Sequence, residues 1–148
     1  MKKQSFGKPL CRVIMAVAIM LLSLQAMAYD FSYTHQGKTL YYEITSSNSV
    51  KVAACDTTVN GDVVIPSSLE YNGTTYSVTY IGSYAFYDCS GLTSIDVASG
   101  NTHYSSIDGV LYNYVQDTLI QCPGAKTSVT IPNSVTSIGG YAFFVCIK

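Results

Sequence analysis

The chain is poor in residues that bind polyanions or carry out chemistry. Its 148 residues include no tryptophan, only two histidines and only 11% charged residues. Without the N-terminal segment described below, four lysines remain against nine acidic residues, a net charge of −5. A nucleic-acid surface needs clustered Lys and Arg to displace counterions, and an anionic membrane surface attracts a basic stripe. The composition therefore argues against a nucleic acid or a membrane surface as partner.

Motifs of known catalytic and cofactor sites are also missing. The sequence has no Gly-x-Ser-x-Gly, no Cys-x-x-Cys, no His-Glu-x-x-His and no phosphate-binding glycine loop. His35 and His103 stand alone, and a triad of His103, Asp108 and one of many serines would be a coincidence that abundant serine makes easy. The four cysteines after residue 28 are separated by 34, 33 and 24 residues, which fits no zinc motif. We therefore predict no enzyme activity, no metal and no cofactor.

Residues 1–28 have the three parts of a secretory signal peptide. A basic segment precedes the apolar run Val13–Leu24, and Ala26-Met27-Ala28 is a small-x-small cleavage site. As a helix this run would cover about 18 Å, short of the roughly 30 Å hydrocarbon core, so an uncleaved anchor is the weaker alternative. We predict cleavage after Ala28, no membrane span after cleavage, and a secreted or cell-surface protein.

The remaining chain favours strands and turns. It holds all thirteen tyrosines, sixteen serines and fourteen threonines. Gln36-Gly37 and Asn72-Gly73 are turn signals, and the latter indicates a hairpin tip more simply than the glycosylation sequon it also matches. Apolar and β-branched patterns predict strands at Phe31–His35, Lys38–Ile44, Val50–Cys55, Asp62–Ile65, Leu92–Val97, Ser106–Asn113 and Asp117–Gly124.

Two segments of the chain are repeated. Ile81-Gly82-Ser83-Tyr84-Ala85-Phe86-Tyr87-Asp88-Cys89 returns as Ile138-Gly139-Gly140-Tyr141-Ala142-Phe143-Phe144-Val145-Cys146, and Val64-Ile65-Pro66 is echoed by Thr130-Ile131-Pro132. The Ile-Pro and Ile-Gly parts are sixteen residues apart in the first copy and seven in the second, because the first contains the Asn72-Gly73 hairpin. Repeats of this kind stack to bury apolar faces that a single unit cannot bury alone.

The repeated pattern Ile-Gly-x-x-Ala-Phe-x-x-Cys-x-x-Leu-x-x-Ile resembles the BspA-like leucine-rich repeats of bacterial surface proteins, of Bacteroidales type. The resemblance implies a mainly β fold: a leucine-rich-repeat solenoid with short parallel strands and short helical turns, the latter starting at Ser83 or Gly140. An antiparallel β ribbon at residues 29–60 would precede repeats at 61–148. Within these, about 98–128 would be an irregular unit, and the last repeat is incomplete.

The repeat spacing assigns roles to individual residues. We expect these to point into the core: Ile81, Ala85, Phe86, Cys89, Leu92, Ile95, Ile138, Ala142, Phe143 and Cys146. Cys89 and Cys146 are 57 residues apart, which suggests two coils and a Cα separation of roughly 10 Å, beyond the about 7 Å limit for a disulfide. We therefore predict that both are buried free thiols. The candidate ligand-facing residues are Tyr84, Tyr87, Tyr104, Tyr112 and Tyr114; the alternative is that half of them pack against neighbouring coils.

The resemblance implies a function in adhesion. The first hypothesis is a binding module for a host matrix protein or another cell surface; the alternative is a structural spacer from a longer array, without binding activity of its own. A glycan-active enzyme would need two carboxylates facing a cleft, whereas most acids here lie at turns. Because no Leu-x-x-Ile strand follows Cys146, we expect a truncated array or self-association through the uncapped C-terminal coil. We expect Phe143 to reach the core, and Phe144, Val145 and Ile147 to be partly exposed.

Overall fold

The computed structural model describes residues 29–146, which form eleven strands and no helix. The mainly β class is therefore confirmed. Residues 1–28, for which a signal peptide is predicted, and Ile147 lie outside the described residues. The strands are β1 Phe31–His35, β2 Lys38–Ser46, β3 Ser49–Cys55, β4 Gly61–Ile65, β5 Ser68–Tyr71, β6 Thr74–Ile81, β7 Leu92–Val97, β8 Tyr104–Ile107, β9 Val110–Asn113, β10 Thr118–Gln121 and β11 Ser137–Ile138.

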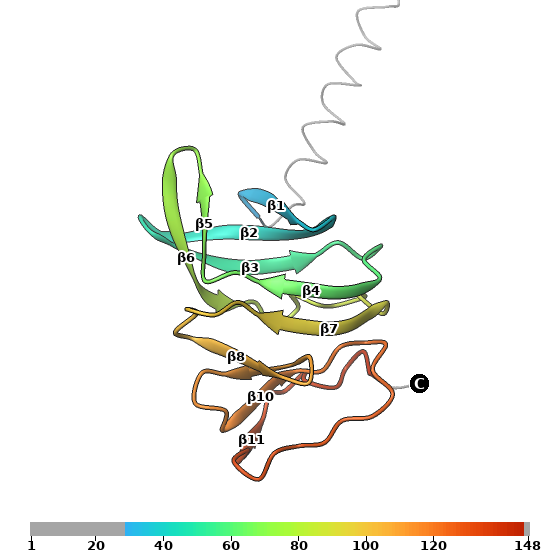
Figure 1. The fold of residues 1–148 in the computed structure, drawn as a ribbon. Helices are drawn as coiled ribbons and strands as arrows, with labels where there is room; N and C mark the ends of the chain where they lie inside the picture. Colours follow the sequence, from blue (N-terminus) through green and yellow to red (C-terminus); the bar gives the residue numbers. More distant parts are fainter. Residues whose placement is uncertain (1–28, 147–148) are drawn as a thin grey trace, which may run out of the picture.

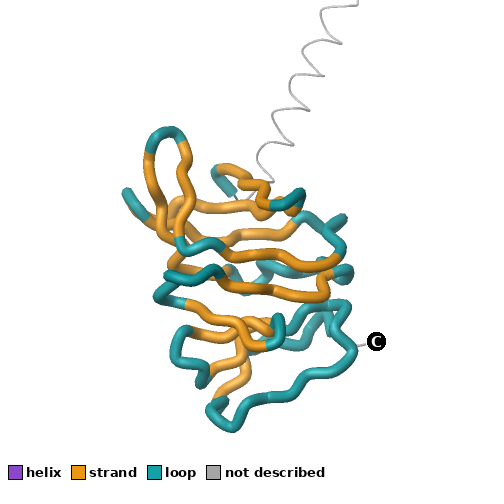
Figure 2. Tube along the Cα trace, viewed as in Figure 1, coloured by secondary structure: helices purple, strands orange, loops and turns teal. Residues whose placement is uncertain are grey.

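Strands β1, β2, β3, β4, β7, β8, β10 and β11 follow one another down the molecule, while β5 and β6 form a hairpin that stands upright beside β1–β3 (Figure 1). Turns and loops connect the strands along this stack (Figure 2). They form a five-stranded sheet in the order β1-β2-β3-β6-β5, a pair β4-β7 and a four-stranded sheet β11-β10-β9-β8. Three pairings are parallel: β3 with β6, β4 with β7, and β10 with β11. Each of them joins segments that belong to successive parts of the chain, as expected for stacked repeats.

Both predicted glycine turns are present. Gln36 and Gly37 have φ values of 49° and 74° and connect β1 to β2, and Asn72 and Gly73 have 50° and 74° and connect β5 to β6. Positive φ at both central residues is the geometry of the tight hairpin turn that matches strand twist. The expected antiparallel ribbon is β1-β2-β3.

The predicted strand Ser106–Asn113 is wrong, because the chain turns within it. Asp108 and Gly109 have φ values of 49° and 71° and separate β8 from β9, which pair antiparallel. A Cβ at Gly109 would lie 3.0 Å from the Cα of Ser94, so only glycine fits against β7. The Asp-Gly signal was present in the sequence, and the apolar residues on both sides of it obscured the turn.

The expected helical turns are also wrong. In the first copy Ala85, Tyr87 and Cys89 each donate a backbone hydrogen bond to the carbonyl three residues earlier. Ala142, Phe144 and Cys146 repeat the pattern in the second copy. The segments are thus successive turns without a helix. Fewer than ten residues between two fixed ends are too few to offset the cost of nucleating an α-helix.

Most of the expected core residues are buried. Ile81, Ala85, Phe86, Cys89, Leu92 and Ile95 belong to one apolar cluster with β2, β3 and β4, and Ala142 belongs to a second cluster with β9 and β10. Phe143 is half-buried and packs on the second cluster, and Cys146 is half-buried.

Ile138 departs from the expectation, because its side chain is 46% exposed. It lies on β11, an edge strand of its sheet with only two residues, so within residues 29–146 no further strand covers it. No helix among the described residues is long and apolar enough to cross a membrane.

Candidate ligand-binding surface

The five tyrosines proposed to face a ligand have different environments. Tyr84, Tyr87 and Tyr114 are exposed, at 58%, 47% and 58% of their surface. Tyr104 is half-buried, and Tyr112 is fully buried in β9. Three of the five candidates therefore remain at the surface, and the prediction for Tyr112 is wrong.

Tyr112 and Tyr104 are structural residues. Tyr112 belongs to the second core cluster, its hydroxyl has no hydrogen-bond partner, and burial raises its pKa. Tyr104 packs against the first cluster, and its hydroxyl accepts a hydrogen bond from the backbone N–H of Ile81 at 3.0 Å. Burial also raises the pKa of Tyr104. Tyr104 thus connects β8 to the end of β6, and it is not available to a ligand.

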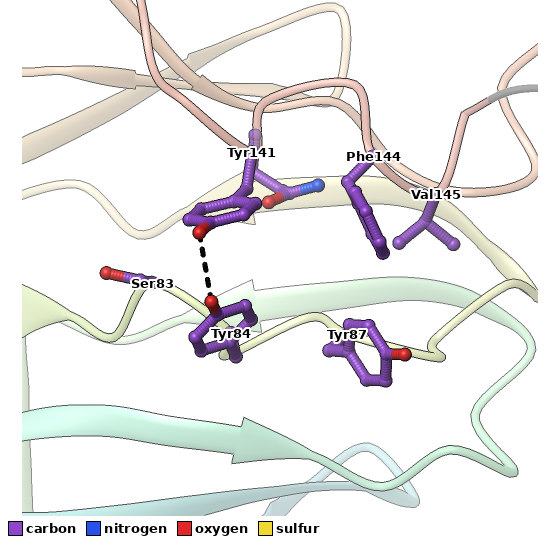
Figure 3. A pocket seen from close by; sticks show the side chains of 7 residues that line it. Ser83, Tyr84, Tyr87, Tyr141, Phe144 and Val145 are labelled. Carbon is purple, nitrogen blue, oxygen red and sulfur yellow. Dashed lines mark hydrogen bonds between the residues drawn. The ribbon is translucent and has the colours of Figure 1, made fainter.

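Four aromatic side chains from the two copies of the repeat form a cluster at the surface (Figure 3). We call Tyr84, Tyr87, Tyr141 and Phe144 the aromatic ladder. Tyr84 lies against Tyr141 with ring centroids 4.9 Å apart, and Tyr87 stacks on Phe144 at 5.7 Å. Within each copy the two rings meet edge to face, at 6.2 Å and 6.1 Å. These are favourable aromatic geometries, so the four rings hold one another in place.

The ladder is exposed as well as ordered. Its members expose 58%, 47%, 43% and 56% of their surfaces, in the order of the sequence. The hydroxyl of Tyr84 donates a hydrogen bond to that of Tyr141 at 2.9 Å, which raises the pKa of Tyr84. Tyr84 is therefore neutral at physiological pH, and the ladder offers apolar ring surface together with hydroxyl groups.

A shallow hollow lies among the rings. Its volume is only about 10 Å³, and its lining includes Ser83, Val145 and the buried Gln121. A second hollow of about 160 Å³ shares Ser83, Gln121 and Tyr141 with it and is also lined by Gly82 and Gly139. No charged side chain lines either hollow. A ligand would therefore be held by ring contacts and neutral hydrogen bonds, without ion pairs.

The sequence contained a signal for the two ladder residues that were missed. Tyr84 and Tyr141 occupy the same position of the repeated pattern, as do Tyr87 and Phe144. A position that is exposed in one copy is expected to be exposed in the other, provided that neither copy is covered. The prediction named Tyr84 and Tyr87 of the first copy and omitted Tyr141 and Phe144, their equivalents in the second.

A layer of small residues separates the two copies. A Cβ at Gly124 would lie 2.8 Å from the Cα of Ser90 and 2.9 Å from Cγ1 of Val145, so the Gly124 backbone fits tightly between them. Both Cys89 and Cys146 were expected to be buried; Cys89 is buried, whereas Cys146 is half-buried.

The described residues form no group of three or more His, Cys, Asp or Glu side chains able to hold a metal ion. His103 is exposed, and its Nδ1 lies 3.2 Å from the hydroxyl of Thr102.

The repeated turns, the parallel pairing of successive segments and the cluster of buried Ile, Ala, Phe and Cys fit a leucine-rich-repeat-like fold. Residues 113–148 match the family described as "BspA type Leucine rich repeat region (6 copies)". This confirms the resemblance drawn from the sequence. A comparison with curated proteins finds no match.

Two solved structures are similar to the chain. A leucine-rich repeat protein from Eubacterium ventriosum is 34% identical, with a TM-score of 0.46, and the match covers 55% of this chain and 20% of that one. The pneumococcal vaccine antigen PcpA is 11% identical, with a TM-score of 0.41, over 79% of this chain and 62% of that one. In both cases the chain spans less than two thirds of the protein it matches.

Proposed function

We propose that this protein is a secreted or cell-surface binding module whose repeats form a solenoid and whose aromatic ladder contacts the ligand. The ligand class is a host matrix protein or another cell surface. The observation that carries the proposal is the ladder itself: four aromatic rings fixed by mutual contacts, yet about half exposed to solvent. Contiguous exposed apolar surface with a polar surround is typical of interaction sites.

The chemistry of the ladder supports a protein ligand. Tyrosine and phenylalanine offer large contact areas with few rotatable bonds, so little conformational entropy is lost on binding. In the ladder this loss is smaller still, because each ring already contacts two others. Aromatic side chains dominate the binding energy of protein interfaces, and charges are depleted at interface centres. Both hollows likewise have no charged side chain in their lining.

Export is the second part of the proposal. Residues 1–28 carry the basic, apolar and cleavage parts of a signal peptide, with cleavage after Ala28. Low charge and abundant Tyr, Ser and Thr are compatible with a protein that acts outside the cytoplasm. Such a location would place the ladder where a matrix protein or another cell can reach it.

Self-association is a further proposal for the C-terminal segment, and a distinct observation favours it. Ile138, on the edge strand β11, and Ile131, seven residues before it, expose 46% and 45% of their surfaces. An exposed edge strand pairs readily with another chain. A solution mass that rises with protein concentration would support pairing; a mass that stays monomeric up to high concentration would refute it.

Binding through the ladder is tested by replacing Tyr84 and Tyr87 with serine. These are surface positions, so the fold should be retained, and a change in circular dichroism would reveal any loss. Aromatic residues that anchor an interface cost 2 kcal/mol or more when truncated, about 30-fold in Kd. The matched control is Tyr80→Ser, since Tyr80 is 53% exposed and is not part of the ladder.

The measurement is binding of the purified variants to immobilised matrix proteins and to whole cells. We expect the double variant to lose at least tenfold in affinity while the Tyr80 variant binds as the parent does. Equal binding of all three proteins would refute the role of the ladder. No binding by the parent protein to any matrix protein or cell would favour the structural spacer.

A further inference from the structure

The four cysteines of the described residues lie in two pairs with the same geometry. In the first thiol pair, Cys55 and Cys89 both direct their Sγ atoms to the carbonyl oxygen of Asp56, at 3.4 Å and 3.7 Å. Cys55 ends β3, whereas Cys89 closes the repeated turn that follows β6. Both side chains are buried, at 5% and 1% exposure.

The second thiol pair repeats this arrangement. Cys122 and Cys146 direct their Sγ atoms to the carbonyl oxygen of Pro123, at 3.5 Å and 3.0 Å, and the thiol of Cys146 also lies 3.1 Å from the carbonyl oxygen of Cys122. Cys122 directly follows β10, and Cys146 closes the second copy of the turn. In each pair, then, the residue after the first cysteine provides one oxygen that both thiols share.

We propose that each thiol pair is a site of disulfide formation, giving Cys55–Cys89 and Cys122–Cys146 when the protein folds in an oxidising compartment. In each pair both sulfur atoms lie within 3.7 Å of one oxygen, and the two thiols also hydrogen-bond to each other. Rotation about the Cα–Cβ bonds can then move the sulfurs toward the about 2.05 Å of a disulfide. The inference rests on the export proposed above, since disulfides persist outside the cytoplasm and rarely within it.

The shared carbonyls would not be left unpaired by this change. The oxygen of Asp56 also accepts the backbone N–H of Val59 at 3.0 Å, and that of Pro123 accepts the N–H of Lys126 at 3.1 Å. Loss of the weak thiol hydrogen bonds therefore leaves both oxygens with a stronger donor. Burial of an unsatisfied carbonyl, which would otherwise oppose bond formation, does not arise.

The reaction needs a disulfide oxidant, as a thiol–disulfide oxidoreductase or oxidised glutathione. A thiolate of the pair attacks the oxidant's disulfide, which forms a mixed disulfide and releases one thiol of the oxidant. The second thiol of the pair then attacks the protein sulfur of this mixed disulfide and releases the other thiol of the oxidant. One sulfur–sulfur bond forms in the protein and one breaks in the oxidant. The protein loses two electrons and two protons per pair, and the oxidant leaves as two thiols.

The environment of the thiols determines at which stage of folding the disulfides form. Cys89 and burial raise the pKa of Cys55, and burial, followed by the Cys122 thiol, raises the pKa of Cys146 to about 12. With a pKa of about 12, roughly one thiol in 10⁵ is ionised at pH 7, so the folded, reduced protein reacts slowly. We expect the bonds to form while the chain folds and to be protected from reductants afterwards.

The test is to refold the reduced full chain in a glutathione redox buffer, with Cys11 replaced by serine so that only the two pairs remain. Free thiols are then blocked with iodoacetamide, and cross-linked peptides are identified by mass spectrometry. Random pairing of four cysteines would give about one third of each connectivity. We expect Cys55–Cys89 with Cys122–Cys146 in most of the material. Four alkylated cysteines, or near-equal connectivities, would overturn the proposal.

Two further arms separate the possible causes of failure. The same analysis of protein exported by a bacterial host tests whether the bonds form after secretion. If the protein is not exported, the export proposal fails, whereas the refolding experiment still tests the disulfides. In a Cys89→Ser variant, Cys122–Cys146 should still form and Cys55 should stay free. A bond from Cys55 to either remaining cysteine would show that pairing follows availability instead of position, against the proposal.

Discussion

Replacement of Asn101 by alanine should destabilise the fold strongly, because this side chain joins three separate segments. Asn101 is 6% exposed. Its Nδ2 donates to the carbonyl oxygens of Pro66 and Val78, at 3.2 Å and 3.4 Å. Its Oδ1 accepts the backbone N–H groups of His103 and Tyr104, both at 2.9 Å. The amide thus holds together the end of β4, strand β6 and the start of β8.

The magnitude follows from these four hydrogen bonds. A buried donor or acceptor that loses its partner costs about 1–3 kcal/mol. Three of the four bonds are only partly buried, so water can replace part of the loss there. We therefore expect Asn101→Ala to lower the free energy of unfolding by about 2–4 kcal/mol, out of the about 5–15 kcal/mol typical of a domain. The midpoint of thermal unfolding should fall by roughly 8–16 °C.

Replacing Asn101 with aspartate tests the acceptor and the donor groups of the amide separately. Asn101→Asp keeps an acceptor for the two N–H groups but places a carboxylate oxygen against two carbonyl oxygens. Burial and these carbonyls should raise the pKa of the new carboxyl group in the folded state. Its cost should then be largest at pH 7 and should shrink as the pH falls and the group takes up a proton.

The assay is urea unfolding followed by tyrosine fluorescence and circular dichroism. Asn133→Ala is the matched control, because Asn133 is exposed, and it should change stability by less than about 0.5 kcal/mol. An Asn101→Ala protein as stable as this control would refute the reasoning. So would an Asn101→Asp protein whose deficit does not depend on pH.

Other perturbations test other parts of the molecule. Gly124→Ala should cost more than 1 kcal/mol, because the added Cβ would lie 2.8 Å from neighbouring backbone, whereas Gly140→Ala, with no atom within 4 Å, should be neutral or slightly stabilising in the same urea assay. Hydrogen bonding, first from Asn113, lowers the pKa of Asp117 below 3.8. Its contribution to stability is thus present above about pH 4 and lost on further acidification, and this part of the pH dependence should vanish in Asp117→Asn. Intact-mass measurement of exported protein should show the loss of residues 1–28, and a retained segment would contradict cleavage.

Local signals in the sequence predicted much of the fold. The Asn-Gly and Gln-Gly turns and the strands next to them depend on neighbouring residues alone, and the structure has them. The strand Leu92–Val97 matches its expected bounds because alternation and the flanking glycines agree. The repeated pattern also identified the buried Phe86 and Cys89.

Exposure of individual tyrosines could not be predicted in the same way. Tyr112 and Tyr114 are two residues apart and each has one apolar and one polar neighbour, yet one is fully buried and the other is 58% exposed. The difference arises because β10 packs beside β9, and the chain then turns away at Tyr114. Such burial depends on the pairing of distant segments, which no local pattern encodes. The same holds for the contact between Tyr84 and Tyr141.

The β5–β6 hairpin has a consequence for where this fold can accept new sequence. Residues Thr74–Tyr76 of β6 pair only with β5, whereas Ser77 pairs with both β5 and β3, and the rest of β6 pairs with β3. The tip at Asn72-Gly73 therefore projects beyond the sheet (Figure 1), and Phe31 stacks on Tyr71, the residue directly before the tip, with ring centroids 4.1 Å apart. Peptides inserted between Asn72 and Gly73 would lengthen the hairpin without shifting the register of the strands below. This tip is thus a natural position for grafted epitopes or for a randomised loop library.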